Sequence, residues 1–227
     1  RFLNKVGYRG MRALKEDLRL RLPDQDVQSD ERLHSLLSSS QSALINEESA
    51  AILKLVEQVA TQEWREATEL ITKAERIFLT GFQTVKGISE DFARRLSIVR
   101  DAVRFVAVHD GGLVEWTMPS QSMERGDNVL ILTDVTPYAA EAETICKIAT
   151  ERGISIIVFT DEFNNWAYAY TSHVFHVHTK TGSFLETTAP LVSLMNFMVH
   201  SVAEKQPDKV RQRIENWQEV TGRLELF

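Results

Sequence analysis

Apolar runs alternate with amphipathic stretches through the second two-thirds of the chain. The runs are short, rich in β-branched residues, and predict strands at 76–80, 103–108, 128–133, 154–160 and 173–177. Continuous apolar strands joined by crossover helices are typical of a parallel sheet covered on both faces. The pattern therefore predicts an α/β fold. Five strands favour a flavodoxin-like doubly wound sheet, with ligands at the carboxyl ends of the strands.

The helices of this region are predicted from apolar residues that recur every three or four positions. One helix follows the first strand and carries Val85 to Val99, and a second runs from near Tyr138 to Gly153. A long helix is expected from about Phe184 to Glu204, with Ser183 as its N-cap. The last helix is expected at 209–224, and a short one at 111–118.

The N-terminal third reads as helical rather than mixed. Residues 31–73 carry two apolar sets at helical spacing, which would pack against the body or against a partner subunit. A polar stretch at 24–30 separates them from a short head. The sequence thus predicts three regions. Residues 1–22 are the head, 23–73 are a linker and lead-in helices, and 74–227 are the α/β body.

The head differs from the body in charge. It holds seven Arg or Lys residues against Glu16 and Asp17, a net +5 in a chain whose net charge is −6. A basic head on an acidic body can mark a contact with nucleic acid, although on charge alone a solvated helix face is the better explanation. Two short helical patterns around Gly7 indicate the end of a helix-turn-helix domain.

Composition excludes several classes. The only cysteine, Cys146, rules out an internal disulfide and fits a reducing compartment, and we expect it in the core. No apolar run approaches the ~20 residues needed to span a bilayer. We therefore expect a cytoplasmic location and no membrane contact. His176 and His178 share a strand face without a third ligand, so no metal or cofactor is predicted. The chain starts on Arg1, which suggests a fragment or a trimmed product.

Two stretches of the body carry a family resemblance. GFQTVKGISEDFARRL at 81–96 and TDVTPYAAEAETICKIATERGISIIVFTD at 133–161 resemble a sugar isomerase (SIS) domain. The head, RFLNKVGYRGMRALKEDL, resembles the end of the winged helix-turn-helix that precedes this domain in RpiR-type transcriptional regulators. Arg1-Phe2, Val6-Gly7-Tyr8 and Leu14-Lys15 stand where that family has Arg-Phe, Leu-Gly-Phe and Leu-Lys.

The resemblance implies a regulator rather than an enzyme. In that family the first domain binds operator DNA and the SIS domain senses a phosphosugar. By this likeness Arg1 and Lys5 are remnants of the DNA contact, and DNA is a partner of the full-length N-terminal domain. The implied effector is a sugar phosphate or a sugar acid. The implied assembly is a homodimer or homotetramer.

The two ligand loops depart from the family pattern. The first loop, Gly-x-Gly-x-Ser in the family, keeps its first glycine but has Gln83 and Val85 at the next two motif positions. In the second loop, Ser-x-Ser-Gly-x-Thr, only Thr133 keeps a hydroxyl in register. Asp134 would repel a phosphate if it pointed inward. The predicted ligand-binding residues are Gly81, Gln83, Thr84, Thr133, Thr136 and Glu186.

Three functions remain compatible with the sequence. The first is a regulator whose SIS domain senses a sugar phosphate or related metabolite. The second is a ligand-free SIS module that serves assembly alone, which the altered loops favour over an enzyme. The third is a phosphosugar isomerase, which requires a positioned general base and a phosphate clamp.

Overall fold

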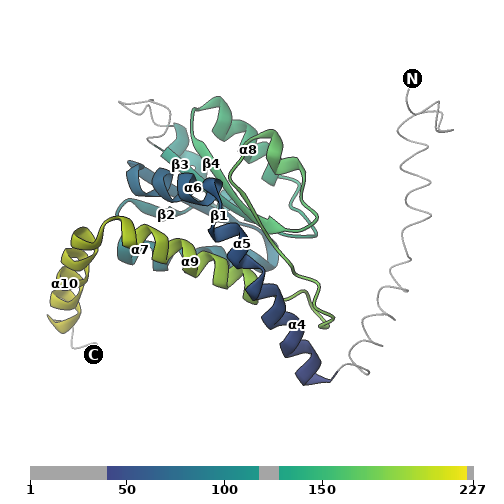
Figure 1. Ribbon diagram of the computed structural model, residues 1–227. Coiled ribbons are helices and arrows are strands. Elements are labelled where there is room, and N and C mark those ends of the chain that lie inside the picture. The colour runs from purple at the N-terminus through teal and green to yellow at the C-terminus, as the bar shows by residue number, and fades with distance from the viewer. Residues whose placement is uncertain (1–39, 118–127, 224–227) are drawn as a thin grey trace. The chain divides into compact units, whose positions relative to one another are not determined.

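The computed structural model describes residues 40–117 and 128–223 (Figure 1). Residues 48–179 and 187–223 belong to one compact unit, and the segments 40–47 and 180–186 belong to a second. The predicted head, with Arg1 and Lys5, lies outside the described residues. The described residues cover most of the α/β body and part of the predicted lead-in region.

A five-stranded, all-parallel sheet forms the centre of the larger unit. Its strands are β1 (Arg76–Gly81), β2 (Val103–Phe105), β3 (Asn128–Asp134), β4 (Ser155–Asp161) and β5 (Val174–Val177). They lie in the order β2-β1-β3-β4-β5, which confirms the predicted flavodoxin-like topology. The strand order reverses between β1 and β3. In such folds the crevice at this reversal, outside the carboxyl ends of the strands, is the usual ligand site.

The described helices come before, between and after the strands. The lead-in comprises α4 (Gln41–Leu53), α5 (Leu55–Val59) and α6 (Gln62–Lys73). The crossovers include α7 (Lys86–Val99) and α8 (Ala142–Glu151), and the chain continues through α9 (Ala189–Lys205) and α10 (Pro207–Arg223). Short 3-10 turns occupy 83–85, 108–110, 112–117 and 166–169. None of the described helices is long and apolar enough to cross a membrane.

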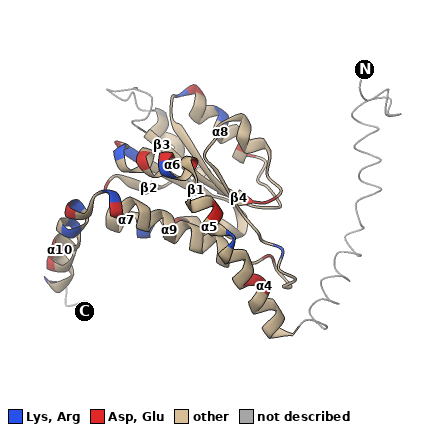
Figure 2. Cartoon of the chain, viewed as in Figure 1, with Lys and Arg blue, Asp and Glu red and all other residues tan. Residues whose placement is uncertain are grey.

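The sheet is covered on both faces because the middle of each central strand is apolar on both sides, as in Val129–Leu132 of β3 and Ile156–Phe159 of β4. Alternate residues such as Leu79 and Ile131 pack into one core with α5, α6, α7 and α9. Their neighbours Phe78 and Leu130 pack into a second core with α8, where Cys146 is fully buried as predicted. Figure 2 shows that most Lys, Arg, Asp and Glu residues lie on the helices, whereas the central strands carry few charged residues.

An aromatic cluster holds the first of these cores together. The ring of Phe159 lies 5.7 Å from those of both Phe92 and Phe175, and Trp64 meets Phe175 edge-on at 5.1 Å. Trp64 also donates a hydrogen bond from Nε1 to Ser201 Oγ at 3.1 Å. These rings join α6 and α7 to β4 and β5, and the Trp64–Ser201 hydrogen bond adds α9 to the cluster.

Three predicted boundaries were wrong. The second strand ends at Phe105 because residues 108–110 coil into a 3-10 turn. The helix after β3 begins at Ala142 rather than near Tyr138, because the intervening loop is bound to two aspartates described below. The long helix begins at Ala189 and has Thr188 at its N-cap position, so Ser183 does not cap it.

The free edge of β5 is closed by a side chain from the lead-in helices. Gln58 accepts a hydrogen bond from His176 N at 2.7 Å and donates one to the carbonyl oxygen of the same residue. An amide side chain thus pairs with the backbone as a neighbouring strand would. This protects an edge that could otherwise pair with another chain.

Candidate functional site

A cavity of about 270 Å³ opens where the strand order reverses, beside the carboxyl ends of β1 and β3. We call it the strand-end crevice. The segments that follow β1, β2 and β3 all contribute to its lining, which comprises Gly81, Phe82, Gln83, Lys86, Ala107, Val108, His109, Ala139, Ala140 and Glu141. A parallel sheet places these three segments at one edge, so the site is a consequence of the topology.

The loop after β1 passes close to α7 and bends sharply. A Cβ added to Gly81 would lie 2.6 Å from Ser89 Cβ, so only glycine fits at this strand end. Gln83 stands where the family motif has its second glycine, and its backbone keeps a positive φ of 46°. Non-glycine residues adopt that conformation infrequently. The loop therefore retains a glycine-like path while presenting an amide side chain.

Replacing Gly81 by alanine is expected to cost roughly 1–3 kcal/mol of unfolding free energy, because the new methyl group overpacks the β1–α7 contact. Urea denaturation followed by circular dichroism measures the loss. The second substitution Ser89→Gly removes the clashing atom, so the double variant should lose less than the two single losses combined. Strictly additive losses would show that the contact does not explain the glycine.

The loop after β3 is organised by two buried carboxylates. Asp134 ends β3 and accepts a hydrogen bond from Ala139 N at 3.1 Å. Asp161 ends β4 and accepts from Thr136 N at 2.5 Å, from Phe163 N at 3.0 Å, and from the Tyr138 hydroxyl. Each aspartate is only 1% exposed. The loop is therefore held in place by the protein's own acidic groups.

Burial raises the pKa of Asp134 to about 7, and the neighbouring Asp161 carboxylate adds to this effect. The hydrogen bond from Ala139 acts in the opposite direction and lowers the pKa in part. Burial, together with the hydrogen bond to Asp161, also raises the pKa of Tyr138 well above its usual range. Tyr138 consequently remains a hydrogen-bond donor at any physiological pH.

The predicted ligand residues differ in their placement. Gly81 and Gln83 line the crevice, and Thr84 lies exposed in the same turn. Thr133 is fully buried, and its hydroxyl has no hydrogen-bond partner among the described residues. The Thr136 side chain is exposed while its N–H binds Asp161. Glu186 belongs to the segment 180–186 of the other unit, so it is described apart from the crevice.

Four residues of this region were missed by the sequence reasoning. Lys86, His109 and Glu141 line the crevice, with His109 Nε2 at 3.9 Å from Glu141 Oε1. The fourth is Asp161. The sequence did contain a signal for Asp161, because the third and fourth apolar runs both end in Thr-Asp. Parallel pairing of these two strands places their ends side by side, so the two aspartates could have been expected to lie close together.

His176 in β5 and His178 just after it both contact other groups of the protein. The His176 ring contacts the Asp161 carbonyl oxygen through Nδ1 at 2.8 Å and the Tyr168 hydroxyl through Nε2 at 3.0 Å. His178 faces Glu162 at 2.7 Å. Within the described ranges, no cluster of His, Cys, Asp or Glu has the geometry to hold a metal ion.

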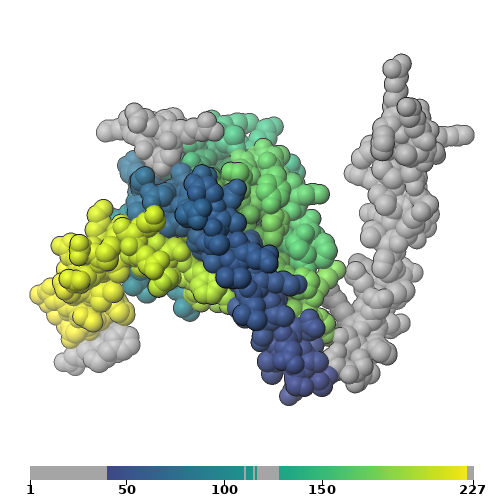
Figure 3. All heavy atoms as spheres, in the orientation of Figure 1, coloured from purple at the N-terminus to yellow at the C-terminus, as the bar shows by residue number. Residues whose placement is uncertain are grey.

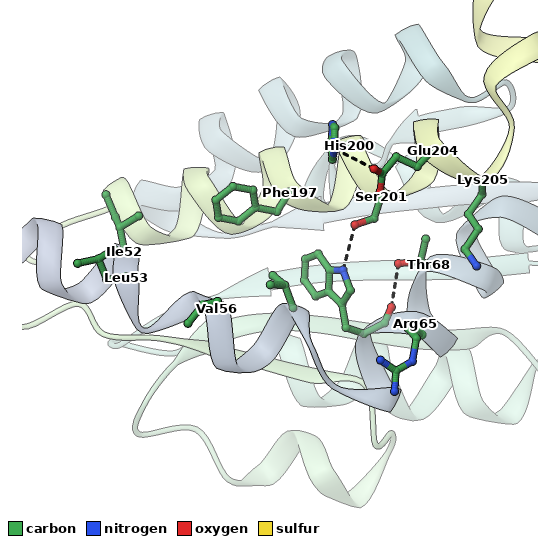
Figure 4. Close-up of a pocket in the computed structure, with 12 residues that line it drawn as sticks. Ile52, Leu53, Val56, Arg65, Thr68, Phe197, His200, Ser201, Glu204 and Lys205 are labelled. Atoms are coloured by element: carbon green, nitrogen blue, oxygen red, sulfur yellow. Dashed lines mark hydrogen bonds and ion pairs between the residues drawn. The ribbon is translucent and has the colours of Figure 1, made fainter.

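A second cavity lies between the lead-in helices and α9, and its lining is mainly apolar. It has a volume of about 700 Å³ and shares no lining residue with the strand-end crevice. In Figure 3 the blue surface of α5 and α6 borders the yellow-green surface of α9 on this face. Figure 4 shows Ile52, Leu53, Val56 and Phe197 along the groove, and Ser201, His200 and Glu204 toward its other end. The groove is therefore apolar at the α4–α5 end and polar toward the end of α9.

Comparison with solved structures finds the same fold in proteins of low sequence identity. The sugar isomerase domain of an RpiR transcription factor from Sphaerobacter thermophilus matches with a TM-score of 0.66 at 14% identity, covering 78% of this chain and 96% of that one. The NanR protein of Vibrio vulnificus, complexed with ManNAc-6P, matches with a TM-score of 0.67 at 14% identity, covering 98% of this chain and 79% of that one.

A third similar structure comes from an enzyme-like protein. A Methanococcus jannaschii protein, for which a 3-hexulose-6-phosphate isomerase function is inferred, matches with a TM-score of 0.55 at 21% identity, covering 74% of this chain and 96% of that one. No curated protein matches the chain. The family model described as the SIS domain matches residues 70–201, which is more than half of the sequence. The chain therefore belongs to the SIS domain family.

Proposed function

We propose that this chain is the sensor part of a transcriptional regulator. Its SIS domain binds a sugar phosphate or a related small metabolite and thereby controls DNA binding by an N-terminal helix-turn-helix domain. The observation that carries the proposal is the strand-end crevice, a polar cavity at the switch point of the sheet lined by the segments after β1, β2 and β3.

Two further observations support a regulator. The basic head resembles the end of the DNA-binding domain of RpiR-type proteins, and two of the similar structures are transcriptional regulators, one of them holding a sugar phosphate. Control of DNA binding requires that the effector binds one conformational state more tightly than another. A homodimer or homotetramer would present paired heads to a palindromic operator.

The isomerase alternative has one observation in its favour, namely the His109–Glu141 pair at the crevice. Both side chains are exposed, at 72% and 48%, and meet at 3.9 Å, a longer distance than a hydrogen bond. The two side chains are therefore not held together as the positioned acid and base that an isomerase requires. We propose that the protein is not an enzyme. Turnover of arabinose 5-phosphate or 3-hexulose 6-phosphate that is lost on His109→Ala would overturn this proposal.

A ligand screen by thermal unfolding tests the sensor proposal. A metabolite at 100 times its dissociation constant adds about 2.7 kcal/mol of stability, which raises the melting temperature by several degrees. Lys86→Ala removes a charged residue from the lining of the crevice. We expect it to raise the dissociation constant of the effector by about tenfold or more.

Lys147→Ala is the matched control, because it removes the same charge from the exposed face of α8. It should leave the affinity unchanged. An effector whose affinity responds equally to both lysine substitutions binds outside the crevice, and the proposal would then fail.

A further inference from the structure

Several backbone donors of the β3–α8 loop are bound to the protein's own aspartates. The N–H groups of Val135 and Ala139 are directed to Asp134. The N–H of Thr136 is directed to Asp161 at 2.5 Å. Phosphate sites in strand–loop–helix units are built from such amides converging on an anion. Here the oxygens of Asp134 and Asp161 already accept from several of these amides.

The two aspartates are firmly bound where they lie. Each is 1% exposed, and Asp161 receives hydrogen bonds from two backbone amides and from the Tyr138 hydroxyl. Turning either carboxylate out of the loop would break these bonds. Leaving it in place would confront an incoming phosphate with like charge at low dielectric.

The start of α8 adds to this effect. Glu141 is its N-cap residue and Glu143 lies in its first turn, so two more carboxylates flank the helix end that would otherwise attract an anion. The basic side chains that line the crevice, Lys86 and His109, come from the segments after β1 and β2. The crevice thus has an acidic side at β3–α8 and a basic side at β1–β2.

We infer that the β3–α8 loop excludes phosphate, and that the effector of the strand-end crevice is an unphosphorylated sugar derivative. Asp134 and Asp161 are the specificity-determining residues, because they fill the anion site. Hydroxyl groups can donate to Glu141, and Lys86 can donate to ring or carboxylate oxygens. The identity of the effector rests on the proposed sensor function, whereas the exclusion of phosphate does not.

Calorimetric titration with matched pairs tests the effector class. The pairs are N-acetylmannosamine with its 6-phosphate, arabinose with its 5-phosphate, and glucosamine with its 6-phosphate. We expect the unphosphorylated member of one pair to bind at least about tenfold more tightly than its phosphate ester. Tighter binding of the ester would overturn the inference. If no member of any pair binds, the sensor proposal loses its support and the phosphate titration below decides the inference.

Titration with inorganic phosphate tests the loop directly. The wild-type protein should show no saturable binding, whereas Asp134→Asn and Asp161→Asn, which keep an acceptor oxygen but lose the charge, should each gain it. Glu151→Gln removes a carboxylate from the exposed far end of α8 and should behave as the wild type. Circular dichroism verifies that the variants are folded. Saturable phosphate binding by the wild type, or no gain in either folded aspartate variant, would overturn the inference.

Discussion

Asp134→Asn is expected to make the protein more stable at pH 8.5, by about 2 kcal/mol, and to leave it no more stable than the wild type at pH 4.5. The reason is the raised pKa of Asp134, about 7 in the folded protein against 3.8 for an ordinary aspartate. Between these values the folded state holds a proton that the unfolded chain has released. Asparagine is neutral throughout this range and avoids the cost of ionising a buried carboxyl group.

The sign follows from proton linkage. A group whose folded pKa is raised stabilises the fold fully below its unfolded pKa, and this contribution is lost as the pH rises through the folded value. Three pKa units correspond to about 4 kcal/mol at most. Part of the gain in the variant is offset, since the asparagine side chain buries an N–H₂ group in place of an oxygen.

Chemical denaturation at several pH values between 4.5 and 8.5 measures the effect. The wild-type unfolding free energy should fall relative to that of the variant as the pH rises from 4.5 to 8. Glu151→Gln serves as the control, because an exposed carboxylate should shift stability by less than about 0.5 kcal/mol at any pH. Parallel pH profiles for the wild type and Asp134→Asn would contradict a raised pKa for the buried Asp134.

Phe159→Ala is expected to cost about 3–5 kcal/mol of unfolding free energy, the largest loss we predict for a single side chain. The Phe159 side chain is fully buried in the middle of the sheet and packs against both Phe92 and Phe175. Its removal loses the transfer free energy of the ring and leaves a cavity that the surrounding strands cannot close.

Urea titration of the two proteins measures this loss. Phe197→Ala is the matched control, because it deletes the same atoms from a ring that is 43% exposed on α9. The control should lose clearly less stability than Phe159→Ala. Equal losses would mean that the aromatic cluster is not the centre of the core.

The sequence predicted the fold well because its signals are local and strong. The central strands contain continuous apolar runs, and such runs have to be covered on both faces of the sheet. The boundaries that were wrong depend on distant side chains. The start of α8 is set by Asp161, 27 positions beyond Asp134 in the numbering, and no local pattern reports that partner.

The candidate site was predicted only in part, for a similar reason. The resemblance pointed to the loops after β1 and β3, and Gly81 and Gln83 do line the crevice. The resemblance did not indicate Lys86, His109 or Glu141. These residues are distant in sequence and line the same cavity only in the folded sheet. Sequence reasoning placed Asp134 in the loop, and the structure adds the amides that it and Asp161 bind.

The most direct test of the account is a calorimetric titration of the protein with the strongest hit from the metabolite screen, repeated on Lys86→Ala and Lys147→Ala. The account predicts saturable binding of a small sugar derivative that weakens by about tenfold or more in Lys86→Ala and is unchanged in Lys147→Ala. Saturable binding that Lys86→Ala leaves intact, or no binding by any sugar derivative at millimolar concentration, would contradict an effector site in the strand-end crevice.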